Sequence, residues 1–143
     1  MKVVERSAIV PFTAAQMFDL VNDVAPYPEF LPWCAASSVE DRSATERIAS
    51  LRIERGVLRT SFSTRNLLQP HTQILMQLIE GPFRSLLGEW QFSAIGEQGA
   101  RVSFHVDFEF QNPLTAIALS AAFESMCATI VDAFAARARE IYR

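Results

Sequence analysis

Two histidines and a pair of carboxylates are the side chains whose chemistry could support catalysis in this 143-residue chain. His71 follows Pro70 in a predicted turn, and His105 shares the polar side of a predicted strand with Asp107 and Glu109. A general base needs a neighbour that orients it and a substrate within reach. Because both histidines and both carboxylates are expected to face solvent, we interpret them as surface groups rather than as acid–base machinery.

The sequence also lacks the motifs of nucleophilic, phosphate-binding and metal chemistry. Its serines have no nucleophile-elbow context, and its five glycines form no phosphate-binding loop. Cys34 and Cys127 lie far apart and, even with the two histidines, do not have the spacing of a four-ligand zinc site. We therefore predict no catalytic residues, no metal, no covalent cofactor and two reduced thiols.

Composition places the chain among soluble globular proteins. Half of the residues are apolar, a fifth are charged and the net charge is −3, and the length predicts a single domain over residues 1–143. Glu5 and Arg6 interrupt the N-terminal apolar run, which argues against a signal peptide. No apolar run is expected to reach the ~20 residues of a membrane span, so we predict a cytoplasmic location.

Twelve of the thirteen basic residues are arginines, which are well suited to phosphate contacts. Arg52, Arg59 and Arg65 have the outward parity of two neighbouring strands and are the candidates for contact with RNA. A second group gathers near the C-terminus: Arg137, Arg139 and Arg143. The negative total charge favours the alternative that these are ordinary surface cations, the second group at a helix end.

Periodicity predicts a strand, a helix, many strands and a long helix. Residues 2–10 have the β-branched content of a strand, and Thr13 with Gln16 has the pattern of a capping box at the start of a helix. Turn signals then divide residues 34–111 into roughly six strands of an antiparallel meander. Asn112 and Pro113 are typical of a helix start, and residues 114–142 contain no further Pro or Gly, which predicts one helix roughly 40 Å long.

Alternation within the strands predicts one apolar face rich in aromatic rings. Its members include Phe62, Trp90, Phe104 and Phe108, whereas the strand TQILMQLIE is apolar on both sides and its inner face stays unassigned. Pockets and cores are lined by the same residue types, so a filled core and a ligand cavity both remain open. The inward polar residues of the strand that contains Phe62 are Thr60, Thr64 and Asn66.

The stretch APYPEFLPWC, residues 25–34, joins the first helix to the strands with three prolines and three aromatic residues. Proline fixes φ and removes a donor, so we expect a stiff, extended connection without helix. It would hold Tyr27, Phe30 and Trp33 at one end of the sheet, either as a plug of the core or as a gate.

Three segments in order resemble the START-like ubiquinone-binding family of the polyketide cyclase/dehydrase superfamily: YPEFLPWC, EGPFRSLLGEWQF, and VSFHVDFEFQNPL running into the terminal helix. The resemblance covers essentially the full length. It implies an α+β helix-grip fold (START/Bet v 1-like), in which a curved antiparallel sheet of about seven strands wraps around a long C-terminal helix and leaves a hydrophobic tunnel between them.

The resemblance further implies non-catalytic binding of ubiquinone or a similar isoprenoid lipid, in support of respiratory electron transfer and with transient contact to the inner-membrane surface. One alternative is a ribosome-associated toxin that binds the large ribosomal subunit and blocks subunit association. Another is a cyclase or hydrolase acting on a polyketide-like substrate. The expected ligand-binding residues are Tyr27, Phe30, Trp33, Phe62, Phe83, Trp90, Phe104, Phe108, Phe123, Met126 and Ile130.

Overall fold

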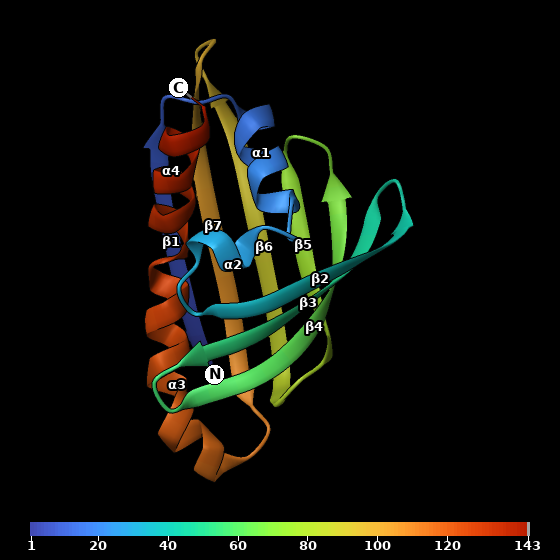
Figure 1. Ribbon diagram of the computed structural model, residues 1–143, viewed down its shortest axis with the longest axis vertical. Helices are drawn as coiled ribbons and strands as arrows, with labels where there is room; N and C mark the ends of the chain where they lie inside the picture. The colour runs from blue at the N-terminus through green and yellow to red at the C-terminus, as the bar shows by residue number, and fades with distance from the viewer. Residues whose placement is uncertain (143) are drawn as a thin grey trace.

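The computed structural model describes residues 1–142 and contains one strongly curved sheet of seven antiparallel strands. Their order across the sheet is β1-β7-β6-β5-β4-β3-β2, so the first strand lies beside the last and β1 and β2 form the two edges (Figure 1). The strands are β1 (Lys2–Val10), β2 (Cys34–Ser43), β3 (Glu46–Arg55), β4 (Leu58–Gln69), β5 (Gln73–Glu80), β6 (Phe83–Ile95) and β7 (Gly99–Phe110).

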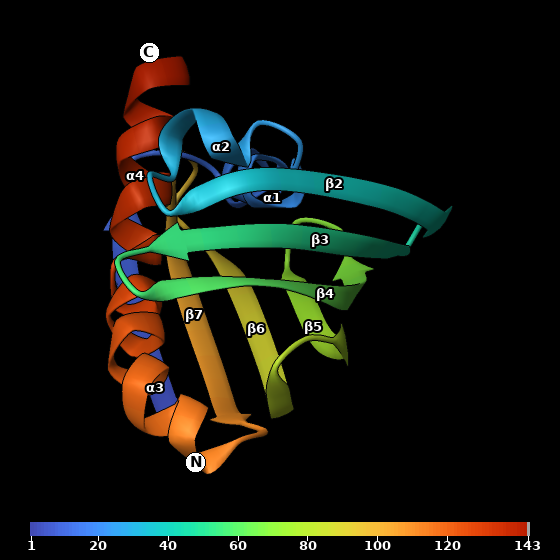
Figure 2. The same ribbon diagram turned by 60° about the horizontal axis from the view of Figure 1, so that its bottom comes forward.

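Four helices accompany the sheet: α1 (Ala14–Asn22), α2 (Tyr27–Phe30), α3 (Pro113–Ala128) and α4 (Ile130–Ile141). The C-terminal pair α3 and α4 runs along β1 and β7, and α1 packs on β6, β7 and α4. Figure 2 shows β2, β3 and β4 crossing in front of β6 and β7, so that the sheet curls toward the helices. The predicted α+β helix-grip architecture with seven strands is confirmed.

Both helix starts form as the sequence predicts. The Thr13 hydroxyl accepts from the Gln16 N–H at 3.1 Å, and the Gln16 side chain accepts from the Thr13 N–H at 2.9 Å. The Asn112 side chain accepts from the Leu114 N–H at 2.8 Å, with Pro113 in the first turn. Each cap satisfies amide groups that the helix itself leaves unpaired.

The prediction of an extended, non-helical connection at residues 25–34 is wrong for its first half. Tyr27–Phe30 forms a single helical turn, α2, with Pro26 at its N-cap and Pro28 in its first turn. Proline is tolerated there because the first N–H groups of a helix have no partner within it. The prolines therefore stiffen the connection as expected but do so around a short helix.

The predicted long C-terminal helix is confirmed, but it bends between α3 and α4. The helix breaks at Thr129, whose hydroxyl donates to the Met126 carbonyl at 2.9 Å and whose N–H contacts the same oxygen at 3.2 Å. A threonine that bonds back to the preceding turn competes with the helical hydrogen-bond ladder and bends the helix. Met126 and Cys127 precede the break and Ile130 follows it, so the bend lies where the helix faces the sheet interior.

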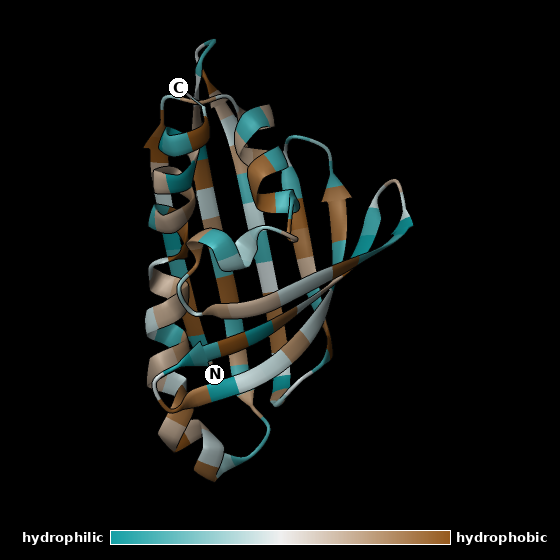
Figure 3. Ribbon diagram, viewed as in Figure 1, coloured by the Kyte–Doolittle hydropathy of each residue, from teal (hydrophilic) through white to brown (hydrophobic). Residues whose placement is uncertain are grey.

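Strand parity holds along β7 as predicted. The alternate residues of β7 from Val102 to Phe110 are buried, and Figure 3 shows the corresponding alternation of apolar and paler bands along β6 and β7. The ambiguous strand β5 turns Ile74, Met76 and Leu78 inward, because Ile74 pairs with Trp90 and Met76 pairs with Gly88 in register. In that position Met76 uses the space that a glycine leaves open.

Helix α3 keeps part of its apolar surface outside the core. Leu114 is 77% exposed and Ile117 is 82% exposed. By length and composition alone, the segment Pro113–Ile141 could cross a membrane. Within the fold, 22% of its most apolar window is buried. The core helices of soluble proteins pass the same test, so the finding corrects the prediction that no apolar run is long enough and shows no more than that.

Candidate functional site

A small cavity of about 70 Å³ lies between the concave face of the sheet and the helices. Strands β3 to β7 form one wall, and residues around the α3–α4 break form the other. Its lining is predominantly apolar: Val24, Tyr27, Trp33, Ala49, Leu51, Phe62, Thr64, Asn66, Met76, Leu86, Trp90, Phe104, Val106, Phe123, Met126, Cys127 and Ile130. A space lined in this way is the type of site that takes an apolar ligand.

Eight of the eleven residues expected to bind ligand line this cavity: Tyr27, Trp33, Phe62, Trp90, Phe104, Phe123, Met126 and Ile130. Their role in binding remains a prediction. Phe30, Phe83 and Phe108 do not line it, because they pack into the aromatic clusters at its two ends.

The first end cluster closes the cavity near the start of α3. Phe83 stacks on Phe110 with ring centroids 4.8 Å apart, and Phe123 lies 5.0 Å from Phe83 and 4.7 Å from Phe108. Phe62 meets Phe83 edge to face at 5.7 Å. Offset and edge-to-face contacts of this kind fill space efficiently, so this end of the predicted tunnel is filled core.

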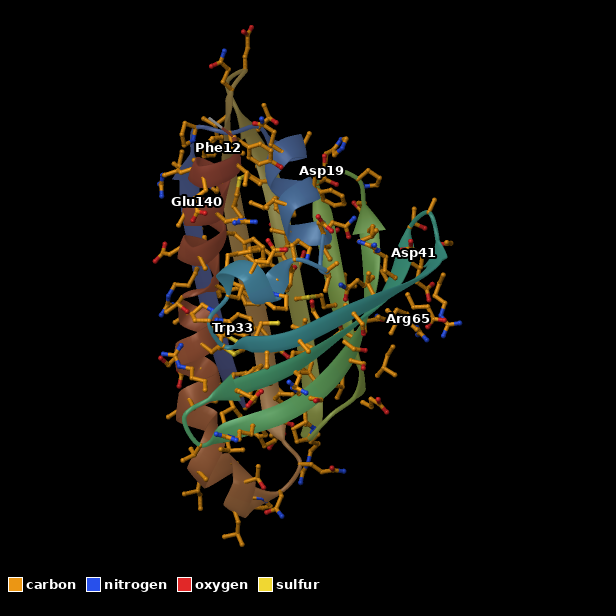
Figure 4. All side chains as sticks on the ribbon, viewed as in Figure 1. Phe12, Asp19, Trp33, Asp41, Arg65 and Glu140 are labelled. Atoms are coloured by element: carbon orange, nitrogen blue, oxygen red, sulfur yellow. The ribbon has the colours of Figure 1, made fainter. Side chains whose placement is uncertain are left out.

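The second end cluster lies beneath α2. Tyr27 and Trp90 pack edge to face on Phe134 at 5.3 and 5.4 Å, and Phe30 lies 5.4 Å from the same ring. The Tyr27 hydroxyl donates to the Val21 carbonyl and so ties α2 to α1. Trp33 is buried where the chain enters β2 (Figure 4). The aromatic residues of the proline-rich connection therefore close this end in the described conformation.

No group that lines the cavity is suited to carry charge near neutral pH. Burial raises the pKa of the Cys127 thiol to about 12, and burial also raises the pKa of Tyr27 well above its usual range. The remaining polar side chains are Thr64 and Asn66, which do not titrate. General acid–base or thiolate chemistry needs a group that can change charge at the working pH.

Sequence reasoning missed nine lining residues as ligand contacts, among them Ala49, Met76 and Cys127. Leu86 and Val106 share the inward parity of Trp90 and Phe104, so alternation alone could have included them. Met76 could not be found in this way because its strand is apolar on both faces. Its Sδ–Cε end crosses Gly88, where an added Cβ would meet Cε at 2.5 Å.

The outer face of the sheet carries the histidine that the sequence placed there. His105 Nδ1 lies 2.7 Å from a Glu5 carboxylate oxygen and Nε2 lies 3.5 Å from Asp107. The hydrogen bond to Glu5 is the main cause that raises the pKa of His105. β1 places Glu5 opposite His105 on β7, so His105 has an orienting carboxylate that is distant in the sequence. The surrounding hollow is open to solvent and is lined mainly by polar side chains.

The arginine candidates point outward as predicted, but each has an acidic partner. Arg52 and Arg59 lie 3.5 and 4.0 Å from Glu54, and Arg65 lies 3.2 Å from Glu46. Figure 4 shows Arg65 on the side of the molecule away from α3 and α4. These pairs reduce the positive potential that a phosphate would meet.

The C-terminal arginines do not form a free cluster within the described residues. Arg137 lies 3.5 Å from Glu29 and 3.4 Å from Glu140, and its guanidinium lies 5.0 Å from the Phe30 ring centroid. Arg139 is exposed, and Arg143 lies outside the described residues. Arg137 therefore links α4 to α2 through its ion pair with Glu29 and its contact with the Phe30 ring.

Comparison with known proteins agrees with this architecture. A family model described as polyketide cyclase/dehydrase and lipid transport matches residues 10–135. A Pseudomonas aeruginosa protein named ribosome association toxin RatA is 44% identical over 97% of this chain and 96% of its own length. A Xenopus laevis protein named coenzyme Q-binding protein COQ10 homolog B, mitochondrial, is 31% identical over 95% of this chain and 57% of its own length.

Among solved structures, the ZhuI aromatase/cyclase from Streptomyces sp. R1128 superposes with a TM-score of 0.88 over 99% of this chain and 96% of that one. The two sequences are 18% identical. At this identity the likeness concerns the fold and carries no statement about activity.

Proposed function

Because the chain belongs to the polyketide cyclase/dehydrase and lipid transport family of START-like proteins, we propose that its cavity binds an apolar, chain-bearing ligand and does not transform it. The observation that carries the proposal is an interior cavity walled by aromatic and aliphatic side chains in which no lining group titrates near neutral pH. A polyprenyl quinone fits this chemistry, and the relative named as a coenzyme Q-binding protein supports the same class. Its cellular role would be in respiratory electron transfer.

The size of the cavity sets a condition on this function. Ligand pockets usually enclose about 300–1,000 Å³, whereas this cavity holds about 70 Å³. Binding of a quinone therefore requires side chains to move apart. The burial of its isoprenoid tail contributes about 25 cal/mol per Å² before the cost of ordering, which can offset such movement.

The enzymatic alternative receives less support. A cyclase or hydrolase in the same cavity would need an inward polar group with a pKa near the working pH. Thr64 and Asn66 supply hydrogen bonds but no acid or base, and the cavity-lining Cys127 is held protonated by burial. The cyclase that superposes well shares only the fold.

Organic extraction of the purified protein, followed by mass spectrometry, tests the proposal directly. We expect an isoprenoid species in the extract, and we expect thermal stabilisation of the ligand-free protein by a short-chain ubiquinone. A matched control is lysozyme or another protein without an apolar cavity, purified from the same host. Extracts free of isoprenoids, together with no stabilisation by any quinone, would contradict the proposal.

A membrane-soluble ligand also requires a route from the bilayer, and α3 offers one. Leu114 and Ile117 project apolar side chains into solvent, and the same helix continues to Phe123 and Met126 in the cavity wall. We expect binding to phospholipid vesicles in a flotation assay that is lost in Leu114→Glu/Ile117→Glu. The control is Ile9→Glu, which charges an apolar residue on β1 that is also exposed, at 63%. Equal flotation of all three proteins would argue against contact through α3.

A second candidate function, association with the large ribosomal subunit, rests on the relatives named ribosome association toxin RatA at about 40% identity over nearly the whole chain. On the outer surface it would use Arg52, Arg59 and Arg65. Because phosphate contacts dominate affinity for RNA, we expect weak, salt-sensitive co-sedimentation with purified subunits. Tight co-sedimentation at physiological salt that is lost on reversal of these three charges would place this function above ligand binding.

A further inference from the structure

Thr64 and Asn66 on β4 form a polar pair in the wall of the largely apolar cavity. Their side chains are two residues apart and therefore point to the same face of the strand. The residues are 4% and 6% exposed, and both line the cavity. The Thr64 hydroxyl donates a hydrogen bond to Asn66 Oδ1 at 2.7 Å.

This hydrogen bond leaves the amide nitrogen of Asn66 without a partner among residues 1–142. The residue that pairs with Asn66 across the strands is Arg47 on β3. The Arg47 guanidinium is itself a donor and is already engaged, with the Asn22 carbonyl at 2.5 Å and with Asp41 at 2.7 Å. A carboxamide nitrogen carries two N–H donors, so the Asn66 Nδ2 can donate to an acceptor oxygen of a molecule in the cavity.

We propose that Asn66 Nδ2 donates a hydrogen bond to an acceptor oxygen on the ligand's head group, and that Thr64 is the positioning residue that holds the amide in this orientation. The inference rests on the proposed function, because it assigns the polar end of a ligand whose apolar part fills the same cavity. The class of ligand is an apolar molecule with a carbonyl oxygen at one end.

The surroundings of Asn66 determine how such a ligand lies. Apart from Thr64, the residues beside Asn66 in the cavity are apolar, including Ala49 and Met76 on the neighbouring strands. The opposite wall consists of Phe123, Met126, Cys127 and Ile130 from the C-terminal helices. The carbonyl end therefore points to β4, and the hydrocarbon part lies against the helices.

Two probes of the same shape separate this inference from the proposed function. One is a short-chain ubiquinone, and the other is an alkylbenzene with the same tail but no ring oxygens. In wild-type protein we expect both to bind. In Asn66→Leu we expect the quinone to bind about tenfold more weakly, equivalent to about 1.4 kcal/mol, while affinity for the alkylbenzene is unchanged or higher.

The infrared C=O stretching frequency of the bound quinone reports directly on a hydrogen bond to its carbonyl oxygen. It would not change if Asn66 only stabilised the fold. We expect a lower frequency in the wild-type complex than in alkane solvent, and loss of this shift in Asn66→Leu and in Thr64→Val. Thr64→Ser retains the hydroxyl and should restore the shift.

The outcomes are distinguishable. If neither probe binds the wild-type protein, the proposed function fails and this inference fails with it. If both probes bind and Asn66→Leu weakens them equally, or if the wild-type complex shows no shift in the C=O stretch, the inference alone is overturned. A wild-type complex without this shift overturns the inference even where a variant does not fold.

Discussion

Filling the cavity with a larger side chain should stabilise the protein and at the same time remove ligand binding. Ala49 lines the cavity from β3 and is the smallest side chain in its wall. A cavity of about 70 Å³ corresponds to about 1.7 kcal/mol at about 24 cal/mol per Å³. The two methyl groups added by Ala49→Val are worth about 1.6 kcal/mol when buried. The free energy associated with the empty cavity and the free energy gained by burying two methyl groups are therefore similar, so we choose valine as the substitution.

Thermal unfolding measures both consequences. We expect Ala49→Val to raise Tm by about 5 °C in ligand-free protein, because about 1 kcal/mol shifts the Tm of a domain of this size by roughly 3–4 °C. We also expect a short-chain ubiquinone to stabilise the wild-type protein and to have little effect on the variant. Stability gained at the expense of function is the usual result of filling a binding site.

The matched control is Ala100→Val on β7, which makes the same chemical change at a fully buried alanine outside the cavity. Overpacking a filled site costs about 1–3 kcal/mol, so this variant should lose stability. If Ala49→Val destabilises the protein as much as Ala100→Val, the cavity is not available space and the reasoning is refuted. If Ala49→Val is stabilising but the quinone effect persists, the ligand binds elsewhere.

Three further predictions concern the filled core, the outer face and a helix cap. In urea unfolding, Phe108→Ala should cost more stability than Phe104→Ala, because Phe104 already borders the cavity and Phe108 does not. The difference should be at most the value of the cavity itself, about 1.7 kcal/mol. Equal losses would indicate a uniformly filled core. The pKa of His105 is raised, chiefly by its hydrogen bond to Glu5, so this pair stabilises the fold below about pH 6.5 and the contribution is lost as pH rises through the folded pKa. Stability should therefore fall more between pH 6 and pH 8 in the wild type than in Glu5→Gln, and parallel profiles would refute this assignment. Thr13→Ala removes half of the capping box and should cost about 1 kcal/mol in the same urea assay, whereas no loss would show that the cap contributes nothing.

Most of the fold could be predicted from the residue pattern within short stretches of the sequence. Alternation along β7 identified its inner face because each apolar residue there is followed by a polar one. The caps at Thr13 and Asn112 were readable because capping depends on residues only two or three positions apart. The turn between β2 and β3, at Ala44–Thr45, contains neither Gly nor Pro and gave no comparable signal.

Two of the features that sequence reasoning did not find depend on contacts between distant segments, and one depends on the conformation of a single side chain. The break at Thr129 follows from a side-chain hydrogen bond that threonine makes in some helices and not in others. Glu5 orients His105 only because β1 pairs with β7, about a hundred residues away along the chain. The inner face of β5 is defined only by its pairing with β6, because both faces of that strand carry apolar residues.

The volume that a ligand needs must come from the side chains that move at the lowest cost, and the structure identifies two of them. Met76 and Met126 line opposite walls, and methionine is unbranched and adapts its shape readily. Met76 lies over Gly88, so no Cβ from β6 restricts where its methyl group goes. By contrast, the aromatic rings of the two end clusters contact one another at 4.7–5.7 Å and would lose several contacts together if one moved. Expansion in the middle of the cavity is therefore less costly than opening at either end, so the first response to a ligand should be repacking of Met76 and Met126.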